Sequence, residues 1–309
     1  MKLDRTTLKY IAVIAMILDH IGVFLLSTYA PGAAAAGIAA GAGSGIVLGG
    51  MTAGGVLSAL YVICRFLGRL TAPIMCFFLA EGFAKTSSRR RYVIRLLVFA
   101  LISQIPYALA HHGGNLFGEV AAAAGGTGNV LLSALTTPDF NMIATLFLSF
   151  LVLVVYDEVR DTRAKWLLII LIIAATYYCD WGVFCPLFVL CFRIFRGNSR
   201  KQMRSFCVIA AILIVLNAAF LWSQGRPWYA ELWQLGMFLF PAVIRLYDGR
   251  PDNGRLYDGQ PGKESSAASA AEKFSSLFFR KWFFYLIYPV HLAVFWLLKA
   301  VFMGVSAYM

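Results

Sequence analysis

Long runs of apolar residues, separated by short basic clusters, constrain this chain more than any other feature of its sequence. Several of the runs approach the roughly 20 residues that an α-helix needs to cross the hydrocarbon core of a bilayer. Only 14% of the 309 residues are charged, against about 25% in soluble domains. The pattern predicts an all-α, polytopic membrane bundle, and it excludes a water-soluble enzyme and a disulfide-stabilised secreted module.

The apolar runs between charged clusters predict about nine transmembrane helices within one domain, residues 1–309. These helices are expected at about 8–29, 56–84, 92–111, 141–157, 166–179, 181–195, 205–223, 231–246 and 283–304. The remaining segments are Gly/Ala-rich exterior loops at about 30–55 and 112–140 and a polar cytoplasmic linker at about 247–280. The first loop is apolar enough to be either exterior or partly re-entrant.

The distribution of basic residues predicts the orientation of the helices. We place the N-terminus inside and the C-terminus outside. The exterior segments then contain one basic residue, Arg226, and three more, Arg65, Arg69 and Lys299, fall within predicted helices. All the other Lys and Arg residues then lie on the cytoplasmic side, as the positive-inside rule requires. The net charge of +12 therefore indicates topology rather than nucleic-acid binding, since no basic block carries interleaved aromatic residues.

The sequence contains no motif of a soluble enzyme. A P-loop, a GxSxG elbow, an HExxH helix, a CxxC pair and a Rossmann fingerprint are all absent. The six cysteines lie in or beside apolar runs and are interpreted as packing residues. We therefore expect no metal site.

Asp19 and His20 are adjacent polar residues inside the first apolar run. A charge at mid-bilayer costs about 2.5–3.5 kcal/mol on insertion scales, so each is a functional hypothesis by default. His20 lies eleven residues beyond Lys9, roughly 16 Å deeper along a helix. Imidazole suits proton transfer near neutral pH, so His20 is either a base near the midplane or a hydrogen-bonded interior histidine.

Arg65 and Arg69 are four residues apart and therefore share one face of the second predicted helix. Two guanidinium groups at that depth need carboxylates, backbone carbonyls or water, and Asp19 and Asp180 are the carboxylates within reach. The pair forms either an anion or oxyanion site or a structural ion pair. Pro73 predicts a kink shortly after it.

Other polar residues are expected near the same level. His291 lies roughly 12 Å into the last helix, so it approaches the depth of His20. It follows Tyr288 and Pro289, where a broken helix can expose backbone carbonyls. Asn141 and Gln104 either add hydrogen bonds to a polar pocket or serve helix packing.

Two acidic residues can be interpreted as structural rather than functional. Glu81, near the cytoplasmic end of its helix, is expected to pair with a loop arginine. Asp180 is at the exterior hairpin, where a solvated turn is as plausible as a partner for the arginines. The arginine-rich cytoplasmic face could hold an anionic cofactor or anionic lipid headgroups.

At these residues the sequence resembles the TraX family, membrane proteins associated with N-terminal acetylation of F-type pilin. The motifs that carry the resemblance are Lys9 to Asp19-His20-Ile-Gly22, Arg65-Phe-Leu-Gly68-Arg69 to Glu81-Gly82-Phe83, Ser103-Gln104-Ile-Pro106-Tyr107, Asn141-Met-Ile-Ala-Thr145, Asp180-Trp-Gly182 and Tyr288-Pro289-Val-His291. Together they span nearly the whole chain apart from the low-complexity segments.

The family is similar to a wider set of transmembrane acyltransferases. Their Arg-x10-His signature appears here as Lys9-x10-His20, with Lys in place of Arg. Arg65 and Arg69 are separated by three residues, where the wider set usually has two. Both differences weaken the link to that set and leave the match to TraX intact.

The resemblance implies that an acetyl group passes from cytoplasmic acetyl-CoA, or another acyl-CoA, to an amine or hydroxyl presented in or across a bacterial inner membrane. His20 would be the base, Asp19 would stabilise the imidazolium, and Arg65 or Arg69 would offset the oxyanion. The expected donor-binding residues are Lys9, Lys85, Arg89, Arg90, Arg95 and Arg196. The expected substrate-binding residues are His291, Tyr288, Asn141, Glu81, Asp180 and Gln104.

Two other functional classes fit the same polar residues. A transporter or flippase would use them as a proton relay and gate, although the sequence shows no inverted repeat. A noncatalytic membrane protein that docks partners is the third class. The acceptor is equally open, because a pilin-like peptide and an envelope glycan or lipid are both compatible with the residues.

Overall fold

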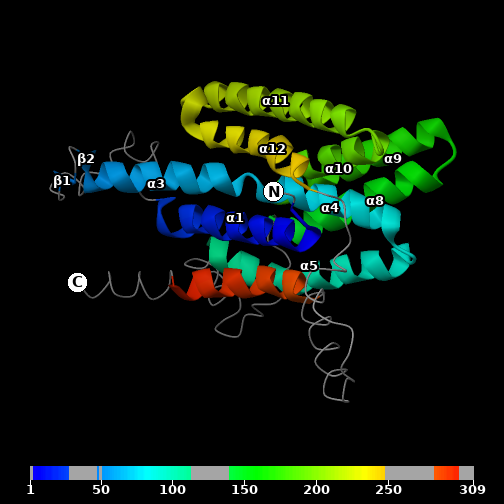
Figure 1. Ribbon diagram of the computed structural model, residues 1–309, viewed down its shortest axis with the longest axis horizontal. Coiled ribbons are helices and arrows are strands. Elements are labelled where there is room, and N and C mark those ends of the chain that lie inside the picture. Colours follow the sequence, from blue (N-terminus) through cyan, green and yellow to red (C-terminus); the bar gives the residue numbers. More distant parts are fainter. Residues whose placement is uncertain (1–2, 28–46, 49–50, 113–138, 248–281, 299–309) are drawn as a thin grey trace, which may run out of the picture.

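The protein is described from a computed structural model, which defines residues 3–27, 47–48, 51–112, 139–247 and 282–298. Within these ranges almost every residue is helical, and Figure 1 shows the long helices lying along the longest axis of the molecule. The predicted all-α architecture is confirmed for this part of the chain. The two predicted exterior loops and the cytoplasmic linker lie largely outside it, so whether the first loop is re-entrant stays a prediction.

Every apolar run that predicted a helix coincides with a helix or a pair of helical segments. The elements in chain order are α1 (Arg5–Leu25), β1 (Val47–Leu48), β2 (Met51–Thr52), α3 (Ala53–Gly68), α4 (Thr71–Lys85), α5 (Arg89–His112), α8 (Met142–Glu158), α9 (Thr162–Ala175), η2 (Thr176–Tyr178), α10 (Phe184–Ile194), α11 (Ser199–Ser223), η3 (Trp228–Leu239), α12 (Phe240–Arg245) and a final helix, Trp282–Leu298. The two short strands pair with each other in antiparallel orientation.

Within the described ranges, four helices are long and apolar enough to cross a membrane: Arg5–Leu25, Gly54–Lys85 (α3 with α4), Arg89–His111 and Ser199–Ser223. Phe184–Ile194 and Trp282–Leu298 are apolar but shorter. The outward faces are apolar as well. Val215 on α11 is 65% exposed and Ile170 on α9 is 61% exposed, so these faces would be in lipid rather than water. The chain is therefore a helical membrane protein.

Polar side chains define where several of these apolar helices begin. Asp4 caps α1 by accepting a hydrogen bond from the Thr7 amide at 2.8 Å. Asn141 caps α8, Asp161 caps α9, and Asn198 caps α11 in the same way. Each cap satisfies at least one of the amide groups that the first helical turn leaves without a partner, and Asn141 satisfies two.

The second predicted helix is interrupted between α3 and α4, at Arg69 and Leu70. We expected a kink at Pro73; the structure instead has a break in the helix one turn before this proline. Proline has no amide proton, so the carbonyl of Arg69, four residues before Pro73, loses its usual helical hydrogen bond. This interruption places Arg69 at a bend, beside α1.

Candidate functional site

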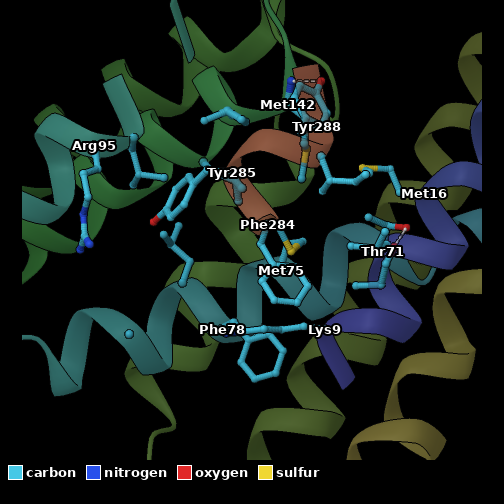
Figure 2. Close-up of a pocket in the computed structure, with 18 of the residues that line it drawn as sticks. Lys9, Met16, Thr71, Met75, Phe78, Arg95, Met142, Phe284, Tyr285 and Tyr288 are labelled. Carbon is cyan, nitrogen blue, oxygen red and sulfur yellow. Dashed lines mark hydrogen bonds between the residues drawn. The ribbon is translucent and has the colours of Figure 1, made fainter. Parts of the chain in front are cut away.

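A cavity of about 370 Å³ opens at the N-terminal end of α1. Side chains from α1, α4, α5, α8 and the final helix line it, and Figure 2 shows them converging from these separate segments. Thr71 joins two of its walls, because its hydroxyl donates to the Ala12 carbonyl at 3.1 Å. Met75, Phe78 and Leu146 are among the apolar residues that line the interior.

Basic side chains from three elements lie around this cavity: Arg5 and Lys9 on α1, Lys85 on α4 and Arg95 on α5. Glu81 accepts a hydrogen bond from Lys85 at 2.6 Å, so its partner is this lysine, one turn along the same helix, rather than the loop arginine we expected. The Nε atoms of Arg5 and Arg95 are buried and have no hydrogen-bond partner among the residues that the structure describes. The cavity therefore combines an apolar interior with an excess of positive charge.

The other end of the cavity reaches two buried histidines. Met16 and Ile287 line the cavity, and their carbonyls contact the Nδ1 atoms of His20 and His291 at 2.7 and 2.8 Å. The two imidazole rings meet edge to face, with 4.7 Å between their centroids. The predicted approach of His291 to His20 is thus confirmed, and the imidazoles lie one helical turn beyond the cavity.

The backbone contacts fix the tautomer of both histidines. A carbonyl oxygen can only accept a hydrogen bond, so each Nδ1 carries a proton, and in the neutral imidazole each Nε2 then carries a lone pair. His291 is 6% exposed, and its Nε2 is buried without a partner in the described part of the chain. Phe24 and Phe295 pack around the pair and keep it in apolar surroundings.

Asp19 faces the opposite way, toward α3. Its carboxylate accepts hydrogen bonds from Arg65 at 2.7 Å and from Arg69 at 2.7 and 2.8 Å, so the predicted pairing with these arginines is confirmed. The carboxylate points away from the imidazole of His20, because adjacent helical residues point about 100° apart. We call Asp19, Arg65 and Arg69 the ion cluster.

Glycine allows the two helices to meet at the ion cluster. A methyl group added to Gly68 would lie 2.4 Å from the Asp19 Cβ, far inside van der Waals contact. On the facing helix, a methyl group on Gly22 would lie 3.0 Å from the Arg65 Cδ. At Gly68 only a residue without a side chain fits, so this glycine sets how closely Asp19 approaches its arginines.

A second cavity, of about 340 Å³, lies on the other side of the ion cluster. Arg69, Asp180, Trp181 and Gln234 are among its lining residues, and the Arg69 guanidinium lies 4.5 Å from the Trp181 ring centroid. Trp181 adopts a left-handed backbone conformation, with φ of 60°, which is rare for a bulky residue and typical of functional sites. Asp180 therefore lines a cavity beside Arg69 rather than a simple solvated turn.

The polar residues at the start of α8 form a hydrogen-bond network. Asn141 donates to the Ala100 carbonyl and to Gln104, both at 2.8 Å, and Gln104 donates to the Asp139 carbonyl at 2.9 Å. The Tyr288 hydroxyl accepts from the Met142 amide at 3.1 Å. Asn141 and Gln104 thus join α5 to α8, while Tyr288 also lines the first cavity.

Not every basic residue expected at the donor site lies there. Lys9, Lys85 and Arg95 line the first cavity, whereas Arg89 is bound to Asp157 and Glu158. Arg90 and Arg196 are exposed and do not line the cavity. Sequence reasoning missed Arg5, although its position one helical turn before Lys9 could have revealed it.

Comparison with known proteins gives one family match. The family model described as TraX protein matches residues 4–242. A probable fimbrial assembly protein FimC, serogroup H1, from Dichelobacter nodosus is 29% identical over 287 residues, which cover 93% of this chain and 92% of that protein. No solved structure matches the chain significantly.

Proposed function

Because this chain belongs to the TraX family, we propose that it is a membrane acyltransferase that moves an acetyl group from acetyl-CoA to an amine or hydroxyl of a membrane-presented acceptor. The observation that carries the proposal is the first cavity. It joins a cluster of basic side chains to an apolar interior, and it ends one turn from two imidazoles with available Nε2 atoms.

The shape and charge of the cavity suit a CoA thioester. The phosphates would bind Arg5, Lys9, Lys85 and Arg95, since guanidinium and ammonium groups are the usual phosphate ligands in proteins. The pantetheine arm would lie along the apolar interior. The roughly 16 Å of helix between Lys9 and His20 would then separate the phosphates from the acyl group.

Topology supports a cytoplasmic source for the donor. Arg5 and Lys9 near the start of α1, and the basic run from Arg89 to Arg95, lie at the end of the bundle where the cavity opens. The positive-inside rule places such residues in the cytoplasm. We propose about nine spans in a bacterial inner membrane, with the N-terminus inside and the C-terminus outside.

His20 is the proposed general base. Its Nε2 would take the proton from the acceptor as the acceptor attacks the acyl carbon, a step commonly worth about 10²–10⁴-fold in rate. Asp19 would act on His20 only through space, because its carboxylate is bound by Arg65 and Arg69. For either arginine to stabilise the oxyanion, its guanidinium would have to leave Asp19.

The acceptor would come from the membrane or the exterior, where the second cavity would lie in this orientation. A pilin-like peptide, and an envelope glycan or lipid, are the two classes of acceptor that we propose. The fimbrial assembly protein from Dichelobacter nodosus favours the peptide, since its name places that relative in fimbrial assembly.

The test measures transfer of radiolabelled acetyl from acetyl-CoA by purified protein in lipid nanodiscs. Three acceptor probes are used: octylamine, octyl glucoside and an apolar peptide with a free N-terminal amine. We expect labelled product with at least one probe, and loss of that product in His20→Ala. A folded His20→Ala protein that transfers acetyl at the wild-type rate would overturn the proposal. Failure of the wild-type protein to bind acetyl-CoA would instead favour a transporter.

A further inference from the structure

The second imidazole of the pair has an unexplained property. His291 Nε2 is buried, carries a lone pair and has no partner among the residues described. A buried acceptor left without a hydrogen bond commonly costs about 1–3 kcal/mol, so natural proteins keep one where a ligand or a proton completes it. The acceptor-deprotonating role already assigned to His20 does not use this atom.

The surroundings of His291 contain one group that can deliver a proton. His20 is the titratable group in direct ring contact from α1, and the Tyr288 ring lies 5.4 Å away on the same helix. The phenol of Tyr288 is held by the Met142 amide, and the carboxylate of Asp19 is held in the ion cluster. His111, on α5, is separated from the pair by the Phe24 ring.

The two histidines also face different parts of the molecule. Both of their helices line the donor cavity: the final helix supplies Phe284, Tyr285 and Tyr288, and α1 supplies Lys9 and Met16 (Figure 2). His20 follows Asp19, and so is next to the ion cluster that borders the second cavity. Both imidazoles therefore lie one turn beyond the donor cavity, and His20 is also next to the cluster that borders the second cavity. His20 is thus nearer the proposed side of the acceptor, which leaves His291 for the donor sulfur.

From this arrangement we infer that His291 is the general acid of the reaction and protonates the sulfur of the departing CoA. The inference rests on the proposed acyl transfer. The acceptor gives its proton to His20 Nε2 while its lone pair forms the bond to the acyl carbon. When the tetrahedral intermediate collapses, the C–S bond breaks and its electron pair stays on sulfur. His291 Nε2 receives the proton from His20 and passes it to that sulfur, so CoA leaves as a thiol and both tautomers are restored.

The test compares two acetyl donors that differ in how much their leaving thiol needs a proton. Acetyl-CoA releases an ordinary thiol, whereas S-acetyl-5-thio-2-nitrobenzoate releases a thiolate that is stable without one. Octylamine is the acceptor. In His291→Gln we expect transfer from acetyl-CoA to fall by about 100-fold or more, and transfer from the nitrobenzoate thioester to stay close to wild type. In His20→Gln we expect both donors to lose activity together, because the acceptor still needs a base.

His111→Gln is the matched control, a histidine replaced by the same residue outside the proposed machinery, and it should keep wild-type rates with both donors. Equal loss from both donors in His291→Gln, or no loss from acetyl-CoA, would overturn the inference while leaving the acyl transfer standing. Absence of transfer by the wild-type protein from either donor would overturn the proposed function, and the inference with it.

A measurement on the wild-type protein covers the case in which His291→Gln does not fold. If His291 protonates the sulfur, transfer from acetyl-CoA should slow more in deuterated water than transfer from the nitrobenzoate thioester. The same solvent isotope effect for both donors would contradict the role.

Discussion

Asp19 and His20 are neighbours in sequence, yet they belong to two different regions of the molecule. Asp19 points toward α3 and is held by two guanidinium groups within 2.8 Å. His20 points toward the final helix and meets His291, and its Nε2 keeps a lone pair. Consecutive residues of α1 thus take part in two different contacts: Asp19 binds two guanidinium groups, and His20 meets an imidazole whose Nε2 has no partner among the residues described.

The ion cluster and the histidine pair are two different ways of placing polar groups inside a membrane bundle. In the ion cluster one carboxylate binds two guanidinium groups, so Asp19 offsets one of the two positive charges and its hydrogen bonds join α1 to α3. We interpret the cluster mainly as a device that fixes these two helices against each other. The Nε2 atom of His291 is buried and has no hydrogen-bond partner in the described part of the chain, so the imidazole pair is suited to accept a proton. Substitutions in the two regions should therefore have separable effects, on stability in one and on chemistry in the other.

The largest expected effect is on chemistry. We predict that His20→Gln lowers the rate of acetyl transfer by about 10²–10⁴-fold, the usual contribution of a general base. The free energy of unfolding should fall by about 1–3 kcal/mol, because the substitution removes the hydrogen bond to the Met16 carbonyl and the ring contacts with Phe24, His291 and Phe295. Transfer kinetics and chemical denaturation in the same detergent measure the two quantities. If the loss of stability were large enough to explain the lower rate of transfer, the histidine pair could not be assigned a role in chemistry that is separate from stability.

The second effect is on stability. Asp19→Ala leaves two buried guanidinium groups without their shared carboxylate; their side chains are 15% and 8% exposed. We predict that the free energy of unfolding falls by about 3–5 kcal/mol, as is typical when one partner of a buried ion pair is removed. Denaturation followed by tryptophan fluorescence measures the change.

A matched control comes from an exposed pair. Glu158, whose side chain is 58% exposed, binds Arg89, and Glu158→Ala should change stability by at most about 1 kcal/mol. If Asp19→Ala were as mild as this control, the ion cluster would not be holding α1 against α3.

The sequence predicted much of both regions, because a charge inside an apolar run must find a partner. Asp19 with Arg65 and Arg69, and His20 with His291, were brought together from depth and helical spacing alone. The helices themselves followed from the apolar runs. The functional roles of these residues stay predictions, and the number and orientation of the membrane crossings are part of the proposal.

Three features were not predicted from the sequence: two are local backbone features, and one depends on how the helices pack. The position of the helix break followed from the carbonyl that Pro73 leaves unpaired, one turn before the proline itself. The left-handed conformation of Trp181 has no local signal, since its side chain does not favour it. The place of Arg5 beside Arg95 at one cavity depends on how α1, α4, α5 and the final helix pack around it, which hydrophobic periodicity does not specify.

The third prediction concerns the crossing of α1 and α3. Gly68→Ala puts a methyl group 2.4 Å from the Asp19 Cβ, so the helices must separate or Asp19 must move. Overpacking of this kind costs about 1–3 kcal/mol, and we predict that loss in the free energy of unfolding. Gly22→Ala should be milder, because its nearest neighbour is the flexible Arg65 side chain at 3.0 Å. Equal stability of Gly68→Ala and wild type would show that this contact does not determine the helix spacing.

The smallest effect should come from single charges around the donor cavity. Arg95 lines the cavity, whereas Arg90, on the same helix, is exposed and does not. If Arg95 binds a phosphate of CoA, Arg95→Gln removes one charge-assisted hydrogen bond and should raise the KM for acetyl-CoA by about tenfold, roughly 1.4 kcal/mol. Arg90→Gln should leave KM unchanged, and kcat should stay close to wild type in both variants. Added salt should reduce the difference between the variants, since it screens the remaining basic groups. Equal KM values for the two variants would show that the phosphates of CoA do not bind at Arg95. The first cavity would then lose its support as the donor site that serves the histidines.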